Sequence, residues 1–255
     1  MDEHKTVLEF RDEWDSLKDD KKALASFLKE RGKISGGTPN LSLAMEAARK
    51  ISDLDGTRDV VDSWLMQDEE YLGIVAILAM GKVMEKQPGT REAIALVLHH
   101  AVLSKKWRIR EAVPLALKDL TEKEPEYVSK LLDRWTEDGY PIMYRTAIEI
   151  LGDVKLLKKK PELRKQYRNM QVKAMSEIAF HPKETGKPME LLRKTLNSSI
   201  TTLAMLDKET FSLMEEWAKD PNLRPILRKN LGNPHFRTKY PDETERMLDF
   251  IETGH

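Results

Sequence analysis

The side chains most able to take part in chemistry form a basic run between Lys155 and Lys173. The stretch "KLLKKKPELRKQYRNMQVK" contains eight basic residues and one acid, Glu162. Lysine and arginine neutralise phosphate whatever the base sequence, so the run is typical of a nucleic-acid contact. The candidate binding residues in it are Lys158, Lys159, Arg164 and Arg168. A solvated loop and helix face in a lysine-rich protein gives the same pattern. We expect that the run is such a solvated surface.

A second basic cluster surrounds a tryptophan. Lys105, Lys106 and Arg108 flank Trp107 in the sequence. Aromatic rings beside cations suit contact with bases or phosphates, so these four residues are further binding candidates. A tryptophan at the start of a helix more often belongs to the core, and we expect Trp107 to be buried.

Other kinds of catalytic machinery are missing from the sequence. There are no cysteines, which excludes disulfides, iron–sulfur clusters, thiolate zinc sites and cysteine nucleophiles. His99 and His100 are adjacent, so on a helix they project about 100° apart and do not converge on a metal ion. No P-loop, dinucleotide fingerprint, nucleophile elbow or paired zinc motif occurs. We therefore expect no metal and no cofactor, and the sequence favours a protein that is not an enzyme.

The composition is that of a soluble globular protein. Of the 255 residues 40% are hydrophobic and 34% charged, with 43 basic and 43 acidic residues. A balanced charge provides no overall attraction to nucleic acid or anionic membranes, so any such binding needs a local patch. The charged amino terminus does not resemble a signal peptide, and no stretch approaches the roughly 18 apolar residues of a membrane span. We expect a cytoplasmic protein with no membrane partner.

The elements that must position these residues are helices. Most segments between glycines and prolines carry apolar residues at helical spacing, and strand-like alternation is almost absent. Val60, Val61 and Trp64 share one such helix face, and the run "YLGIVAILAMG" from Tyr71 to Gly81 predicts a buried helix. The expected fold class is all-α, with about ten to twelve helices.

Four helix starts resemble one another and indicate internal repeats. They are "GIVAILAM" from Gly73, "REAVPLAL" from Arg110, "RTAIEIL" from Arg145 and "RPILRKNL" from Arg224. Their offsets of 37, 35 and 79 residues fit a helical repeat of about 40, the last offset being close to two repeats. We expect a single solenoid domain over residues 1–255. Capping helices and a loop would occupy residues 1–40, repeats 41–233 and a C-terminal cap 234–255.

Three stretches carry a family resemblance. They are "KKWRIREAVPLALKDL" from Lys105, "LLDRWTEDGYPIMYRTAIEILGDVKLLK" from Leu131 and "EEWAKDPNLRPILRKNLGN" from Glu215. The longest shows a rhythm of Trp, two variable residues and Asp, then a turn, an Arg and an Ala- or Ile-rich helix. In this rhythm the chain resembles HEAT-repeat proteins from roughly Asp55 to Asn233. The resemblance implies a right-handed α/α superhelix that acts as a monomeric scaffold and binds a macromolecule, most often a protein, on its concave face.

More distantly, the chain resembles the HEAT-like alkylpurine DNA glycosylases. These enzymes place Trp, Asp and Arg in a concave groove, where aromatic rings hold a cationic damaged base and a carboxylate assists its departure. The counterparts that the resemblance implies are Trp64, Asp68, Trp135 and Arg145. Trp135 and Arg145 recur as Trp217 and Arg224, however, which favours a role in stacking helices. The main hypothesis is therefore a non-catalytic scaffold that binds protein, and the alternative is a DNA-binding or DNA-alkylation-repair protein.

Overall fold

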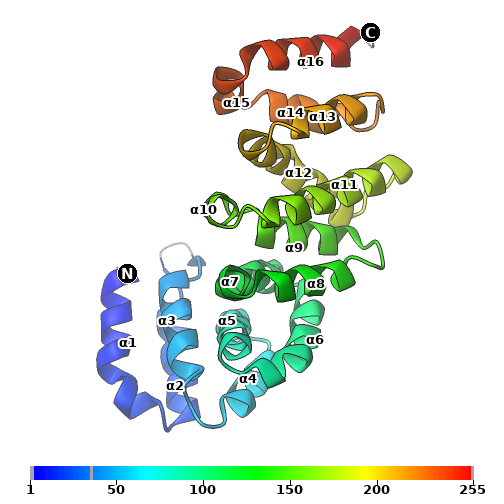
Figure 1. Ribbon diagram of the computed structural model, residues 1–255. Helices are drawn as coiled ribbons and strands as arrows, with labels where there is room; N and C mark the ends of the chain where they lie inside the picture. Colours follow the sequence, from blue (N-terminus) through cyan, green and yellow to red (C-terminus); the bar gives the residue numbers. More distant parts are fainter. Residues whose placement is uncertain (1–2, 35–36, 254–255) are drawn as a thin grey trace. The chain divides into compact units, whose positions relative to one another are not determined.

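The computed structural model describes residues 3–34 and 37–253, and it is built of helices joined by short loops (Figure 1). Within these residues there is no β-strand, and Lys33 and Pro39 form only an isolated bridge. The all-α fold class is therefore confirmed. The predicted terminal caps include residues 1–2, 35–36 and 254–255, which lie outside the described residues.

The helices group into two compact units, which we call unit 1 (Met1–Lys123) and unit 2 (Glu124–His255). Unit 1 contains α1 (Glu3–Leu17), α2 (Lys21–Arg31), α3 (Leu41–Ile51), α4 (Thr57–Leu65), α5 (Glu70–Lys86), the 3₁₀ turn η2 (Pro88–Thr90), α6 (Arg91–Val102) and α7 (Trp107–Lys123). Unit 2 contains α8 (Pro125–Trp135), α9 (Pro141–Leu151), α10 (Val154–Lys159), α11 (Leu163–Phe180), α12 (Lys187–Leu206), α13 (Thr210–Ala218), α14 (Arg224–Leu231), α15 (Pro234–Lys239) and α16 (Pro241–Thr253). A single solenoid domain stays a prediction.

The number of helices exceeds the expected ten to twelve. The described residues contain 16 α-helices. The difference arises from short elements such as α10 and α15, which have 6 residues each. A helix of that length completes fewer than two turns, so it shows no apolar period in the sequence.

Unit 1 is organised around α5, the helix predicted from the apolar run. Twelve of its 17 residues are buried, and it contacts α3, α4, α6 and α7. Where α5 crosses α7 the backbones approach closely, because Gly81 of α5 has no side chain. A Cβ atom at Gly81 would overlap the peptide of Ala116, whose carbonyl carbon would lie 2.7 Å away. Glycine at this position is therefore required for the α5–α7 packing.

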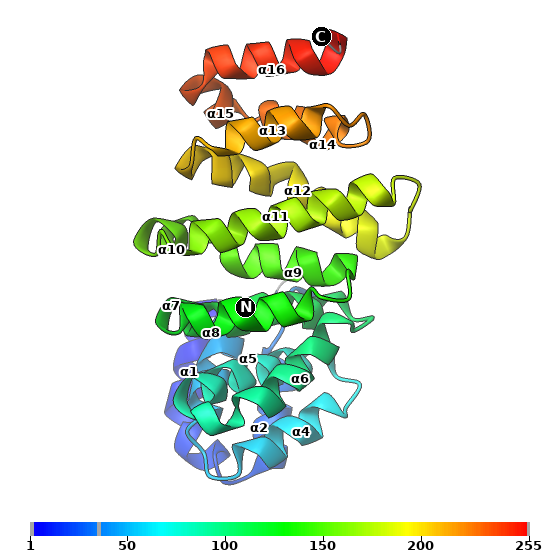
Figure 2. The same ribbon diagram turned by 45° about the vertical axis from the view of Figure 1, so that its right-hand side comes forward.

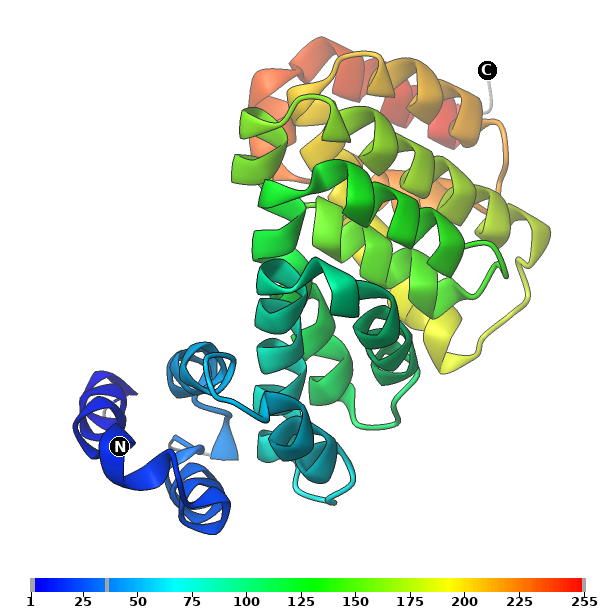
Figure 3. The same cartoon turned by 60° about the horizontal axis from the view of Figure 1, so that its bottom comes forward.

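Helices α1, α2 and α3 form a group at the start of unit 1, shown in blue in Figure 3. A carboxylate links α1 to α3, since Glu46 Oε1 accepts hydrogen bonds from Arg11 Nε at 2.9 Å and from Arg49 Nη2 at 2.7 Å. The side chain of Glu46 is only 9% exposed. The hydrogen bond from Arg49, helped by Arg11 and opposed by burial, lowers the pKa of Glu46 from 4.5 to about 2.

We expect protonation of Glu46 to weaken unit 1 in acid. Because the pKa in the folded state lies below the unfolded value, the stabilisation is complete above pH 4.5 and is lost as the pH falls towards about 2. Glu46→Gln should lower the free energy of unfolding at neutral pH by about 2 kcal/mol, allowing for solvent screening at the half-exposed guanidinium groups. Urea titrations at pH 7 and pH 3 would measure both effects. The exposed Glu13→Gln is the control, and wild-type stability of Glu46→Gln would contradict the expectation.

Unit 2 stacks its helices in successive layers, visible from α9 to α16 in Figure 2. Contacts run from α9 to α11 and α12, from α12 to α14, and from α14 to α16. The layers of α12 and α14 are joined by a buried amide. Asn230 Oδ1 accepts from the backbone N–H of Thr201 at 2.9 Å, and its Nδ2 donates to the carbonyl oxygen of Leu196 at 2.8 Å.

Arginine side chains recur at the corners between successive helices. In four cases the guanidinium Nε donates to a carbonyl oxygen at the end of the preceding helix. The pairs are Arg91 with Met84 at 3.0 Å, Arg164 with Leu157 at 3.0 Å, Arg224 with Ala218 at 2.9 Å and Arg237 with Leu231 at 3.1 Å. We call this arrangement the corner arginine. It occupies carbonyl groups that a helix C-terminus otherwise leaves unpaired.

Across the part of the chain that the structure describes, no helix is both long enough and apolar enough to cross a lipid bilayer.

Candidate functional site

A cavity in unit 1 combines an apolar wall with carboxylates at its edge. It lies among α4, the second half of α5 and the start of α6, and its volume is about 390 Å³. The apolar side chains that line it are Leu54, Val61, Met80, Val83, Ala93, Ile94 and Val97. The charged residues that line it are Asp55, Arg58 and Asp62. We call this the α4–α6 cavity, and its size is within the range of small-molecule sites.

A tight turn sets the position of the charged edge. Gly56 precedes α4 with a φ of 75°, a left-handed conformation that glycine adopts without strain. The next residue, Thr57, donates its hydroxyl to the carbonyl oxygens of Ile51 at 2.7 Å and Leu54 at 2.6 Å. These bonds fix the start of α4 against the end of α3, so Asp55 and Arg58 are held at the mouth of the cavity.

The amphipathic character of α4 separates its apolar and charged sides. Val60, Val61 and Trp64 are buried against unit 1, whereas Arg58 and Asp62 are exposed. The opposite wall comes from α6, whose first residue is a corner arginine, Arg91, anchored to the end of α5.

Asp62 is a loosely held carboxylate at the edge of this cavity. Its Oδ2 lies 3.6 Å from Arg58 Nε, and the two side chains are 51% and 81% exposed. An exposed ion pair of this kind contributes little to stability and exchanges readily with other partners. Asp62 can therefore turn its negative charge towards a cationic group in the cavity.

The structure separates the two members of the implied catalytic set that lie in unit 1. Trp64 is 2% exposed and forms part of the core, and it is not among the residues that line the α4–α6 cavity. Asp68 follows α4 in a loop, and Lys106 Nζ binds both its carboxylate and its carbonyl oxygen, the latter at 3.0 Å. The hydrogen bond from Lys106 lowers the pKa of Asp68. Asp68 thus connects the loop before α5 to the loop before α7.

The other two members belong to unit 2, and both are buried. Trp135 ends α8 and is 6% exposed. Arg145, in α9, is likewise 6% exposed, and its Nη2 lies 2.8 Å from Glu149 Oε1 one turn further along the helix. Both side chains take part in the packing of their own unit.

The basic cluster around Trp107 is largely neutralised. Lys106 binds Asp68, and Arg108 Nη1 lies 2.9 Å from Glu70 Oε2. Trp107 is 54% exposed with the guanidinium of Arg108 4.8 Å from its ring centre, so the expectation that Trp107 is buried was wrong. It begins α7 at the surface, where that cation covers one face of the indole. Lys105 is exposed beside it.

In the basic run between Lys155 and Lys173, the arginines and the lysines differ in their contacts. Arg164, in the first turn of α11, is a corner arginine that binds the end of α10, and Arg168 forms ion pairs with Asp207 and Glu209. Both arginines are therefore engaged in the fold of unit 2. Lys158 and Lys159 are exposed on α10. Of the basic residues predicted to bind, the lysines of α10 remain accessible while the arginines do not.

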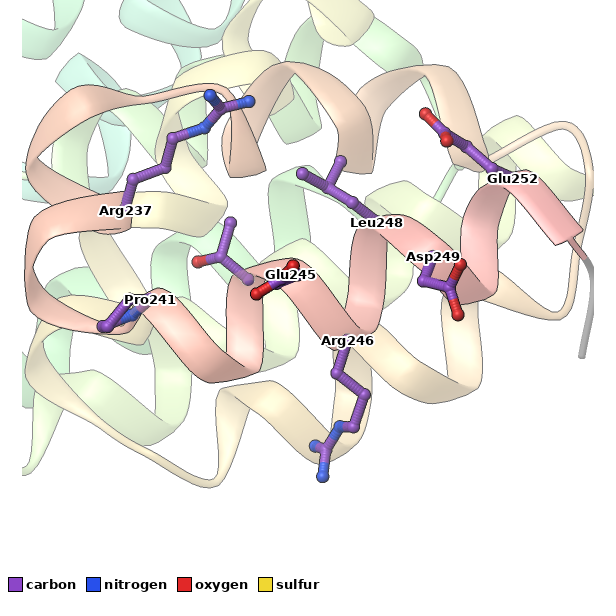
Figure 4. A pocket seen from close by; sticks show the side chains of 8 residues that line it. Arg237, Pro241, Glu245, Arg246, Leu248, Asp249 and Glu252 are labelled. Carbon is purple, nitrogen blue, oxygen red and sulfur yellow. The ribbon is translucent and has the colours of Figure 1, made fainter.

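A second depression lies on unit 2 along α16, with a volume of about 670 Å³ (Figure 4). Its charged lining includes Glu245, Asp249 and Glu252, and its two arginines are engaged elsewhere. Arg237 donates to Leu231, and Arg246 pairs with Glu215. This depression offers acidic side chains, but Pro241 and Leu248 are the only apolar residues that line it, so it is a poorer candidate than the α4–α6 cavity. In the described part of the chain, no three His, Asp or Glu side chains gather as a metal site would require.

Sequence reasoning missed the charged edge of the α4–α6 cavity. Asp55, Arg58 and Asp62 occur in the stretch "LDGTRDVVD", where the available signal was the turn Asp55-Gly56 before an amphipathic helix. Arg58 and Asp62 are four residues apart and so lie on one face. Most of the apolar wall, however, comes from residues 80–97, and no local pattern brings those residues to α4.

Comparison with protein families gives a match to the family described as DNA alkylation repair enzyme, over residues 42–151. The matched segment is less than half of the chain, and it includes every residue that lines the α4–α6 cavity. No curated protein and no solved structure matches the chain. The family match overturns the prediction of a non-catalytic scaffold that binds protein, and it favours the stated alternative of DNA-alkylation repair. It supports the more distant glycosylase-like resemblance and does not support a HEAT-repeat family.

Proposed function

We propose that this protein binds alkylated DNA and hydrolyses the bond between an alkylated base and its sugar, with the α4–α6 cavity as the site that receives the base. One observation carries the proposal. The segment that matches DNA alkylation repair enzymes contains the whole lining of a cavity in which carboxylates border an apolar wall.

The chemistry suits such a cavity. Alkylation of a ring nitrogen gives a purine a positive charge, so the base leaves readily when its bond to the sugar breaks. As that C–N bond breaks, the sugar takes on oxocarbenium character, and a nearby carboxylate stabilises the developing positive charge. Water then forms the new C–O bond and loses a proton to the carboxylate or to solvent, which leaves the free base and an abasic site.

The charged and the apolar residues of the cavity have different roles in this reaction. Asp62 provides the mobile negative charge, because it is held only by the exposed Arg58. Met80, Ile94 and Val97 contribute apolar surface that excludes water around the base and strengthens electrostatic interactions inside. Access to a base in a duplex requires that it leave the stack, which costs least for a damaged base.

Asp62→Asn tests this assignment. We expect the variant to release free methylated purine from N-methylated duplex DNA about a hundredfold more slowly than the wild type, because it loses the negative charge at the cavity. Chromatography of the released base under single-turnover conditions measures the rate. Asp59→Asn is the matched control, since Asp59 is exposed on the same helix but does not line the cavity.

Two results would contradict the proposal at different levels. Absence of free base with folded wild-type protein would reject base excision altogether. Release by Asp62→Asn at the wild-type rate would remove Asp62 from the reaction. Urea unfolding of both variants confirms that neither substitution acts through stability.

A further inference from the structure

Unit 2 contains a structural repeat that the sequence comparison of helix starts did not reveal in full. The segment Gly152–Pro161, "GDVKLLKKKP", and the segment Gly232–Pro241, "GNPHFRTKYP", are offset by 80 residues. Each contains one short helix, α10 or α15, between two longer ones. The set α9–α10–α11 therefore corresponds to the set α14–α15–α16.

Capping and burial confirm the correspondence. Asp153 accepts from the backbone N–H of Lys155 at 2.8 Å, and its equivalent Asn233 accepts from that of His235 at 3.0 Å. Equivalent core positions are buried in both copies: Leu156 and Phe236, Leu151 and Leu231, Tyr167 and Met247, and Gln171 and Ile251. Helices α10 and α15 lie at the same edge of unit 2 in Figures 1 and 2.

Comparison of the two copies shows at which positions a lysine contributes to the fold and at which positions the fold forms without one. Lys159 corresponds to Lys239, whose Nζ donates to the carbonyl oxygen of Met205 at 2.8 Å, so a lysine here has a structural use. Lys158 and Lys165 correspond to Thr238 and Glu245, which shows that the same architecture forms without a cation at either position.

Three lysines of the first copy have unpaired side chains within the described residues. Lys155, Lys158 and Lys165 are exposed, and within the described residues their side chains form no ion pair or hydrogen bond. The start of α11, which carries Lys165, is tied to the end of α10 through Arg164. The acids in the same segment are Asp153, which caps α10, and the exposed Glu162. A local excess of positive charge therefore remains on a chain whose net charge is zero.

We infer that Lys155, Lys158 and Lys165 form a contact surface for the phosphate backbone of DNA. The inference rests on the proposed function, because it takes DNA as the partner. Lysine suits this use, since its ammonium group is a mobile point charge that follows a backbone without requiring one geometry. The surface neutralises phosphates and releases their counterions, whatever the base sequence.

The test is the salt dependence of binding to an undamaged 20-base-pair duplex. Each phosphate contact contributes about 0.9 to the slope of log K against log salt, so replacing all three lysines by alanine should reduce the slope by about 2 to 3. Fluorescence anisotropy between about 50 and 200 mM salt covers the range in which this term dominates. The matched control replaces Lys130, Lys183 and Lys194, three other exposed lysines of unit 2, and should retain the wild-type slope.

The outcomes separate this surface from the proposed function. A wild-type slope in the triple variant, together with base release by the wild type, would overturn the surface and leave base excision intact. If neither the wild type nor any variant releases base, and the salt slope of DNA binding is reduced in the triple variant, the result would support the surface and reject the catalytic proposal. Loss of binding to phosphatidylserine vesicles in the triple variant, with an unchanged DNA slope, would overturn the assignment to DNA in favour of a membrane.

Discussion

Gly81→Ala is expected to lower the free energy of unfolding of unit 1 by about 2–3 kcal/mol. An alanine in a helix interior normally stabilises it by about 1 kcal/mol relative to glycine. Here the added methyl group meets backbone, with the carbonyl carbon of Ala116 at 2.7 Å and its Cα at 2.9 Å. Neither atom can move without shifting α7 away from α5, so the cost of overpacking exceeds the gain in helix propensity.

Gly73→Ala is the matched control, eight residues earlier on the same helix. Its Cβ would lie 2.6 Å from Ile109 Cδ1, which is the end of a flexible side chain. A small rotation of Ile109 relieves that contact, so we expect a change within about 1 kcal/mol of the wild type. Urea titration followed by circular dichroism, with hydrogen exchange of the α5 amides, assigns the effect to unit 1. Equal stabilities for the two variants would contradict close α5–α7 packing.

Asn230→Ala is expected to lower the free energy of unfolding of unit 2 by about 3 kcal/mol. The amide makes four hydrogen bonds inside the unit. Its oxygen accepts from the N–H and hydroxyl of Thr201 at 2.9 and 2.8 Å, and its nitrogen donates to Leu196 at 2.8 Å and Ile226 at 2.9 Å. Removing it leaves the buried N–H of Thr201 unpaired and opens a small cavity, and each of these changes is costly.

Two companion variants make this expectation specific. Asn169→Ala makes the same substitution on the exposed face of α11 and should leave stability within about 0.5 kcal/mol of the wild type. Thr201→Val removes one of the four bonds and should cost about 1 kcal/mol, less than Asn230→Ala. If Asn230→Ala unfolds at the same urea concentration as Asn169→Ala, the amide does not join α12 to α14.

Much of the fold follows from apolar periodicity. The run from Tyr71 to Gly81 predicted a buried helix, and it forms the centre of unit 1. Val60, Val61 and Trp64 were expected to share a face, and all three are buried on α4. Periodicity identifies such faces because a helix of two or more turns repeats its contacts every 3.6 residues. Six-residue helices such as α10 lack that repetition, and they escaped detection.

The candidate site was less accessible to sequence reasoning. The resemblance implied that Trp64 and Asp68 act together, but α4 ends at Leu65, so the two residues do not share a helix face. The partner of Asp68 is Lys106, 38 residues away, and nothing local indicates that ion pair. Asp62 lies at the edge of a cavity whose apolar wall comes mostly from α5 and α6. Tertiary contacts of this kind decide which carboxylates are free to act.

The corner arginines have a consequence for the chemistry of the connections between helices. Each uses Nε, the nitrogen nearest the chain, to hold a carbonyl group, as Arg224 does with Ala218. A guanidinium has further N–H groups beyond Nε, whereas the ammonium of lysine has a single nitrogen at its tip. Arg224→Lys would therefore keep the charge and lose the hydrogen bond to Ala218. In lysine a CH₂ group takes the place of Nε, and the nitrogen lies one bond further from the backbone. Replacement of arginine by lysine should therefore lower stability at the corners between helices, although the same replacement on an exposed helix face should leave stability unchanged.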